Sequence, residues 1–307
     1  MKPPFTLYHY AMSPFSQKVR AMLGYAQLPW QSVTVREMPP RPLLESLAGG
    51  YRKVPVAQIG ADVFCDTKTI AAEIARLSGH RSLALERCSK AAQAQAREAD
   101  LDLLLACLVC ANTPSMGRKL LKSMPLLDIP RFLWDRVNLG RKASLSLSLL
   151  RQPRNVVLAH LERLEEQLQS QPFLFGTEPH HADFSTFHGL WFLRDLGEST
   201  LTQGFDQVNA WMDRILAWGN GRATEVDGAE ALQMLQQFSP RRIAVQHRTD
   251  ARVGRPVSIR PTDYAQEQSS GRLVGATPSQ WILAREVKGM GLVHVHFPKA
   301  GFELLEA

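Results

Sequence analysis

The 307-residue sequence lacks several features that mark particular classes of protein. No run of apolar residues is long enough to cross a bilayer, which takes about 20 residues. The segment Met1-Lys2-Pro3-Pro4-Phe5 leads directly into a strand-like stretch, with no secretory apolar region or small-residue cleavage site. We therefore expect a cytoplasmic protein with no membrane partner.

Cysteine is scarce, and the cysteines do not have the spacing of a disulfide framework. This agrees with a reducing compartment. Cys107 and Cys110 form a C-x-x-C on a predicted helix, but no second pair accompanies them, so we interpret them as packing residues rather than a zinc or redox site. The four cysteines are Cys65, Cys88, Cys107 and Cys110.

Blocks of like charge are also absent, although the formal net charge is +7. Lys and Arg are scattered, which fits a surface that attracts small anions as well as one that binds nucleic acid. We do not expect a nucleic-acid partner, and a gel shift with residues 240–307 removed would test this. We interpret the arginines of that tail as part of a solvent-exposed face of the β-rich module. They are Arg241, Arg242, Arg248, Arg252, Arg255 and Arg260.

The first eighty residues alternate between strand and helix patterns. Aromatic and β-branched residues predict a strand over 5–10, and Ser13-Pro14 has the N-cap and first-turn proline of a helix start. The remaining segments predict a strand at 31–35, a short helix at 41–47, a hairpin over 54–65 and a helix from Asp66 to about Leu77. The order is βαβ followed by αββα.

Beyond this region the pattern becomes helical and then changes again. Apolar residues at helical spacing predict helices at 97–110, 155–169, 182–196 and 208–218. The tail has short β-rich runs separated by Gly and Pro, at 243–246, 256–260, 281–285, 292–297 and 302–305. We predict three domains: an α/β domain over 1–82, an all-helical domain over 86–239 and a small β-rich module over 240–307.

Three short motifs in the first domain suit the binding of a small thiol peptide. In Ser13-Pro14-Phe15-Ser16, a hydroxyl at a helix N-terminus can donate a hydrogen bond to a thiolate, which raises the fraction of nucleophile at neutral pH. A cis Val54-Pro55 bond would explain a proline that leads into a strand, and would turn the Val54 main chain toward a peptide ligand. Asp66-Thr67 at a helix start could hold an ammonium and a carboxylate. Taken singly, Ser13 and Asp66-Thr67 are better explained as ordinary helix caps, and Pro55 is equally well an edge-strand proline.

Together and in this order, the three motifs resemble the cytosolic glutathione transferase family over about residues 5–238. The resemblance implies a thioredoxin-like N-terminal domain, an all-helical domain and a homodimer. It also implies that Val54 and Pro55 pair with the cysteinyl part of glutathione, that Asp66 and Thr67 hold its γ-glutamyl end, and that Lys53 lies near its glycyl carboxylate. Phe15 belongs to the active turn and is included in the expected glutathione site.

The active turn also resembles the Cys-Pro-Phe-Cys of glutaredoxins, with Ser13 and Ser16 in place of both cysteines. Serine cannot form a mixed disulfide, so dithiol chemistry at this turn is not expected. We predict instead a serine-type transferase in which Ser13 activates glutathione, a co-substrate, for conjugation to a small apolar electrophile or for its glutathione-dependent reduction. Tyr8 and Tyr10 are rival hydroxyls, and Ser13 is favoured because the helix dipole acts there.

One alternative remains open at this stage. The chain could be a binding protein that kept the fold, with the tail as its interaction surface, since family resemblance does not fix function.

His180, His181 and Asp183 lack a full ligand set, so no metal site is predicted there. His180 stands where the family usually has Ser or Thr in a capping box with Asp183.

Overall fold

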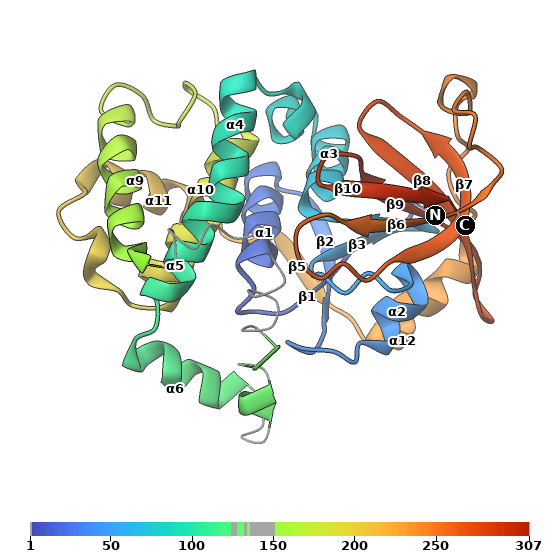
Figure 1. Ribbon diagram of the computed structural model, residues 1–307, viewed down its shortest axis with the longest axis horizontal. Coiled ribbons are helices and arrows are strands. Elements are labelled where there is room, and N and C mark those ends of the chain that lie inside the picture. Colours follow the sequence, from blue (N-terminus) through green and yellow to red (C-terminus); the bar gives the residue numbers. More distant parts are fainter. Residues whose placement is uncertain (1, 124–127, 132–133, 136–150, 307) are drawn as a thin grey trace. The chain divides into compact units, whose positions relative to one another are not determined.

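The computed structural model describes residues 2–123, 128–131, 134–135 and 151–306. The chain divides into two compact units, and each is described by itself. The first contains Met1–Ala11, Pro29–Ile70 and Arg222–Ala307, and the second contains Met12–Leu28 and Ala71–Gly221. Figure 1 shows the elements in chain order.

The first unit is built on one ten-stranded sheet with the order β10-β6-β7-β8-β9-β4-β3-β1-β2-β5. Two helices, α2 (Pro42–Ala48) and α12 (Gly228–Gln233), also belong to this unit. The strands are β1 (Phe5–His9), β2 (Pro29–Thr34), β3 (Val56–Ile59), β4 (Asp62–Cys65), β5 (Arg222–Glu225), β6 (Pro256–Pro261), β7 (Ser269–Ala276), β8 (Gln280–Val287), β9 (Gly291–Pro298) and β10 (Phe302–Glu306).

The predicted order of the N-terminal region is confirmed. Strand β1 runs parallel to β2 and antiparallel to β3, and β3 forms the predicted hairpin with β4. The turn of this hairpin contains Gly60, whose φ of 61° is a conformation that glycine adopts without a Cβ penalty. The chain then enters α3 (Thr67–Ser78), so the thioredoxin-like arrangement expected from the sequence is present.

The C-terminal β-rich segment is not a sheet of its own, because its strands extend the N-terminal sheet. Strand β9 pairs in parallel with β4, and β5 pairs in parallel with β2 at the other side. In Figure 1 the orange and red strands continue the sheet begun by the blue strands. At the β4–β9 seam, the buried carboxylate of Asp62 lies 2.9 Å from His296 Nε2 and accepts a hydrogen bond from the main-chain N–H of Arg241.

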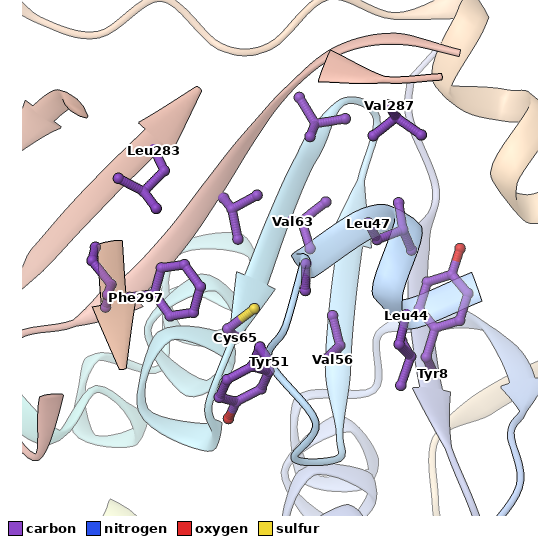
Figure 2. Close-up of a cluster of buried hydrophobic side chains, with 14 of the residues drawn as sticks. Tyr8, Leu44, Leu47, Tyr51, Val56, Val63, Cys65, Leu283, Val287 and Phe297 are labelled. Carbon is purple, nitrogen blue, oxygen red and sulfur yellow. The ribbon is translucent and has the colours of Figure 1, made fainter. Parts of the chain in front are cut away.

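One apolar core joins the two parts of this unit. Buried side chains from the N-terminal strands and α2 pack in the same cluster as side chains from β6 to β10. Figure 2 shows Tyr51 and Cys65 beside Phe297 of β9, and the Tyr51 and Phe297 ring centres are 5.8 Å apart. Burial of such side chains contributes roughly 1.5–3 kcal/mol each, so the tail is part of the folding unit that carries β3 and β4.

The second unit consists of helices, as predicted for the middle of the chain. Helix α10 is buried along almost its whole length and packs against α1, α4 and α5. Short 3₁₀ or π turns lie at 81–83, 85–87, 99–103, 192–196 and 200–202. The helices are α1 (Pro14–Ala26), most of α3, α4 (Lys90–Glu98), α5 (Leu104–Cys110), α6 (Pro114–Ser123), α9 (Pro153–Gln167), α10 (His181–Trp191) and α11 (Asp206–Leu216).

Several local predictions differ from the structure. The continuous helix expected over 97–110 is interrupted by a π turn at Ala99–Leu103, where Asp100 faces the interior. Residues 243–246 were expected to be β-rich, but the ordered element there is a 3₁₀ turn, Val245–His247. Strands β5 and β7 were not predicted, because β5 is exposed throughout and β7 contains two serines and two glycines, which have low strand propensity.

Gly24 on α1 allows a close main-chain contact within the second unit. A Cβ added there would lie 2.9 Å from the Gly219 carbonyl carbon and closer still to its oxygen. We expect Gly24→Ala to destabilise the protein by about 1–3 kcal/mol through this clash. Urea unfolding would measure the change.

Gly117 provides the matched control for this substitution. It lies inside α6 with nothing within 4 Å of an added Cβ, so Gly117→Ala should be neutral or stabilising by up to about 1 kcal/mol. Equal effects of the two substitutions would contradict the importance of the contact between Gly24 and Gly219.

Across the described residues, no single helix is long and apolar enough to span a membrane. A bent pair, Lys90–Cys110 with Pro114–Ser123 at 98°, meets the length and composition criteria together.

Candidate functional site

The hairpin register brings two of the predicted motifs to one edge of the sheet. Val56 of β3 pairs with Cys65 of β4 in antiparallel register. Pro55 and Asp66 are the residues just outside this pair, so they lie next to each other on strands about 4.8 Å apart. Strand β1 ends at the same edge, because Tyr8 pairs with Val56. The antiparallel hairpin therefore explains why motifs eleven residues apart in sequence meet in space.

The Val54-Pro55 peptide bond is cis, as expected from the sequence. Pro55 is buried, while Val54 is half-buried. Strand β3 starts only at Val56, and within the described part of the chain no main-chain hydrogen bond reaches Val54. The N–H and C=O of Val54 are therefore able to pair with an extended peptide in the manner of an added strand.

Asp66 and Thr67 form the start of α3. Asp66 has a φ of 78°, in the left-handed region that few non-glycine residues adopt, and such residues concentrate at functional sites. Its carboxylate accepts a hydrogen bond from the Lys68 N–H at 2.9 Å and lies 3.6 Å from Lys68 Nζ. Thr67 is largely buried at the helix N-terminus, where main-chain N–H groups and the helix dipole favour an anion.

Lys53, the residue expected at the glycyl carboxylate, already has an acidic partner. Its Nζ lies 2.6 Å from Asp263 Oδ1 and 3.9 Å from the centre of the Tyr264 ring. Burial lowers the pKa of Lys53, and the Asp263 carboxylate partly offsets this effect. Asp66 and Lys68 also act on this ammonium, so the four charges belong to one electrostatic group.

The turn that carries Ser13 belongs to the second unit and has the geometry of a helix cap. Ser13 is the N-cap of α1, with φ −74° and ψ 120°, and Pro14 takes the first helical position. Its Oγ accepts a hydrogen bond from the Ser16 N–H at 3.2 Å. Since the hydroxyl oxygen accepts this bond, its O–H remains available as a donor to an anion. Ser13 is only 2% exposed.

Phe15 lies on the first turn of α1 and contacts a buried histidine of α10. The ring centres of Phe15 and His188 are 5.0 Å apart. His188 is fully buried, and its Nε2 lies 3.9 Å from Asp100 Oδ1. Asp100 is itself held by Lys18 of α1, whose Nζ lies 2.9 Å from both carboxylate oxygens. A buried charged cluster therefore supports the helix that presents Ser13.

Burial in this cluster lowers the pKa of His188 to about 4. A histidine in the unfolded chain titrates near 6.5, so between these values the unfolded state binds more protons and stability falls as the pH decreases. Relative to His188→Leu, we expect the wild type to lose about 2 kcal/mol of unfolding free energy between pH 7 and pH 5. Urea titrations at the two pH values would measure it, with His247→Leu as control. The same pH dependence in wild type and His188→Leu would contradict this assignment.

Tyr8, one of the two tyrosines considered as alternatives to Ser13, is part of the buried core. It is fully buried, and its hydroxyl donates a hydrogen bond to Gln58 Oε1 at 2.5 Å. Burial raises the pKa of this phenol. Tyr10, the other rival, lies under the Arg41 guanidinium, 5.9 Å from the ring centre. The choice of Ser13 over these two hydroxyls stays a prediction.

The four cysteines are free thiols and do not resemble activated nucleophiles. Burial raises the pKa of each of them, most strongly at Cys65 and Cys107. A thiol with a raised pKa holds little thiolate at neutral pH.

Asp183 carries one half of the capping arrangement at α10. Its carboxylate accepts hydrogen bonds from the His180 N–H, the Leu174 N–H and Trp211 Nε1, each at 2.9 Å. These three donors account for the burial of a carboxylate in the middle of the helical unit. The structure thus assigns Asp183 a structural role. The described residues contain no group of three or more His, Cys, Asp and Glu that could hold a metal.

Sequence reasoning missed Asp263 and Tyr264, the residues that contact Lys53. They follow strand β6 in the tail, more than two hundred residues from Lys53, and an acidic residue in a segment without a periodic pattern gives no signal of its position. It also missed the pair of Lys18 and Asp100, because Lys in an amphipathic helix is normally exposed.

Comparisons with known proteins identify the family to which the chain is similar. The model of the family "Glutathione S-transferase, N-terminal domain" matches residues 7–82, and that of "Glutathione S-transferase, C-terminal domain" matches residues 151–214. No match was found among curated proteins. A solved GST-like protein from Pseudomonas syringae is 30% identical, with a TM-score of 0.79, and the alignment covers 99% of this chain and 100% of that one. A glutathione S-transferase from Sinorhizobium meliloti 1021 is 20% identical over 71% of this chain and 90% of its own, with a TM-score of 0.49.

Proposed function

Since this chain belongs to the glutathione S-transferase family, we propose that it binds glutathione and activates the thiol for attack on a small apolar electrophile. The observation that carries the proposal is the pairing of Val56 with Cys65, which places Val54-Pro55 beside Asp66-Thr67. A peptide main chain, an ammonium and a carboxylate each find a complementary group at that one edge. In the chain, strand β1 is followed by the turn that carries Ser13.

Each residue has a defined role in this proposal. The Val54 main chain pairs with the cysteinyl residue of glutathione, Asp66 receives the γ-glutamyl ammonium, and Thr67 with the α3 N-terminus holds the adjoining carboxylate. Ser13 donates its O–H to the sulfur and stabilises the thiolate. It forms no covalent bond to the substrate, so the bound thiolate is the nucleophile and its sulfur forms the new bond to the electrophile.

The main alternative is a binding protein that keeps the glutathione site without turnover. The ion pair between Lys53 and Asp263 is the observation that favours it, since it joins the tail to a residue of the proposed site. Calorimetry with glutathione beside a panel of electrophile assays separates the two. Binding with turnover supports the transferase, binding without turnover supports the alternative, and absence of binding contradicts both. We also propose a homodimer, as is usual in the family, which sedimentation analysis would test.

Thr67→Val removes one hydroxyl with little change of shape. We expect the dissociation constant for glutathione to rise about tenfold or more, because a hydrogen bond to a charged carboxylate is lost. Thr224→Val, on the exposed strand β5, is the control and should leave binding unchanged. Calorimetry on both variants would measure the effect, and an unchanged constant in Thr67→Val would show that the carboxylate is held elsewhere.

A further inference from the structure

The two basic residues before the cis-proline both face acidic residues of one tail segment. This segment, residues 262–268, connects β6 to β7 and is called the acidic loop below. Asp263 contacts Lys53 at 2.6 Å, and Glu267 contacts Arg52 at 3.2 Å. Each of these two positive charges is paired with a negative one, which weakens its attraction for an anionic group.

The acidic loop is anchored at both ends and along its length. The Thr262 N–H donates to the Gly301 carbonyl at 3.0 Å, and the Ser269 hydroxyl donates to the Ala48 carbonyl. Between them, the Gln266 side chain donates to the carbonyls of Thr262 and Asp263. Asp263 is therefore a fixed part of the first unit rather than the tip of a free segment.

A fixed internal carboxylate competes strongly with a carboxylate from solution. The Lys53 side chain is only 10% exposed, so there is little room around its Nζ for a second carboxylate. Groups joined in one chain have effective concentrations of about millimolar or more, which a free ligand must exceed to displace them. A glycyl carboxylate that came close without displacing Asp263 would meet a like charge.

We propose that Asp263 is a specificity-determining residue and that the preferred ligand is a γ-glutamyl-cysteinyl peptide whose C-terminal end is an uncharged amide. This inference rests on the proposed function. Asp263 Oδ1 faces Lys53, while no described residue donates a hydrogen bond to Asp263 Oδ2. The Asp263 side chain is 35% exposed, so Oδ2 can accept an N–H from a terminal amide. A terminal carboxylate has no N–H to give.

Calorimetry with the full chain and two peptides tests the proposal: glutathione and glutathione amidated at its glycine. The wild type should bind the amide at least as tightly as glutathione. Asp263→Asn should shift the ratio of the two dissociation constants about tenfold toward glutathione, because it removes the competing charge and frees Lys53. Asp250→Asn is the matched control, since Asp250 pairs with Arg252 elsewhere in the tail, and it should leave the ratio unchanged.

The outcomes separate this proposal from the function on which it rests. A wild type that binds glutathione about tenfold more tightly than the amide would overturn the role of Asp263 while leaving the proposed function intact. The same holds if Asp263→Asn folds and keeps the wild-type ratio. If neither peptide binds to the wild type or to Asp263→Asn, the proposed function fails and this inference fails with it. The wild-type comparison needs no variant and decides the question even if Asp263→Asn does not fold.

Discussion

Replacing Ser13 by alanine is expected to lower the turnover of glutathione with an aryl halide by about 10²–10³-fold, the usual loss when a preorganised donor is removed. Glutathione binding should remain, because the peptide is held by Val54, Asp66 and Thr67 in the proposed site. The reason is electrostatic: in the proposed site the Ser13 hydroxyl would stabilise the thiolate but add little to the affinity for the neutral thiol. Steady-state kinetics and calorimetry on the same preparation would measure the two quantities.

Two further variants make the Ser13 result specific. Ser16→Ala is the matched control, because Ser16 lies in the same turn and its buried hydroxyl has no hydrogen-bond partner among the described residues. Ser13→Thr keeps a hydroxyl and should recover much of the rate. Thiolate absorbance against pH should show a higher pKa for bound glutathione in Ser13→Ala. If the rate and this pKa both equal those of the wild type, Ser13 does not activate the thiol.

Ser13→Ala also removes the cap of α1. Its Oγ accepts the hydrogen bond from the Ser16 N–H, so we expect about 1 kcal/mol of stability to be lost with it. Rates should therefore be compared at a temperature where unfolding curves show both proteins to be fully folded.

Asp100→Asn should lower the free energy of unfolding by about 3–5 kcal/mol, the usual loss on breaking a buried ion pair. Lys18 is fully buried and would be left as a charge without its carboxylate. Burial opposes the ionisation of Asp100, but Lys18, with smaller contributions from His188 and His181, lowers its pKa to about 2. Urea unfolding at neutral pH would measure the loss.

The stability that is lost in Asp100→Asn should not depend on pH near neutrality. The pKa of Asp100 in the folded protein lies below its value of about 3.9 in the unfolded chain. Ionised Asp100 therefore makes its full contribution to the free energy of unfolding above about pH 3.9, and this contribution is lost only as the pH falls toward 2. The gap between wild type and Asp100→Asn should therefore stay constant from pH 8 to pH 5.

Controls distinguish a buried pair from an exposed one. Asp213→Asn removes an ion-pair partner of Arg194. Because the Asp213 side chain is 68% exposed, this substitution should lower the free energy of unfolding by less than about 1 kcal/mol. The double variant Lys18→Met with Asp100→Leu should recover much of the loss, because no charge remains buried. A loss in Asp100→Asn as small as in Asp213→Asn would mean that water reaches Lys18.

Local features of the site were predictable from the sequence because they depend on local chemistry. Ser13-Pro14 starts a helix, Pro55 before a strand indicated the cis bond, and Gly60 marks the hairpin turn that brings Pro55 beside Asp66. Each rests on the conformational preference of one or two residues. The roles of these residues toward glutathione remain predictions.

The parts that were not predictable depend on contacts between distant segments. The parallel pairing of β4 with β9 leaves no signature in either strand, since alternation predicts a strand but not its neighbour. The sequence pattern of α1 predicts that Lys18 lies at the surface. Its burial depends on Asp100, which turns inward at the π turn and belongs to a different helix. The partner of Lys53 is equally hidden, because the acidic loop has no periodic pattern.

The union of β4 with β9 also sets the order of events during synthesis. Asp62 meets His296 across a separation of 234 positions, and the outer edge of β2 is covered only by β5. An emerging chain therefore holds β1 to β4 with the β2 edge open until β5 has left the ribosome, and with the β4 edge open until β9 has followed near the end of synthesis. The thioredoxin-like segment would stay partly ordered and prone to mispairing until about the last hundred residues of the chain had been synthesised. Its folding in the cell should thus depend on chaperones that shield strand edges more than its ordinary size suggests.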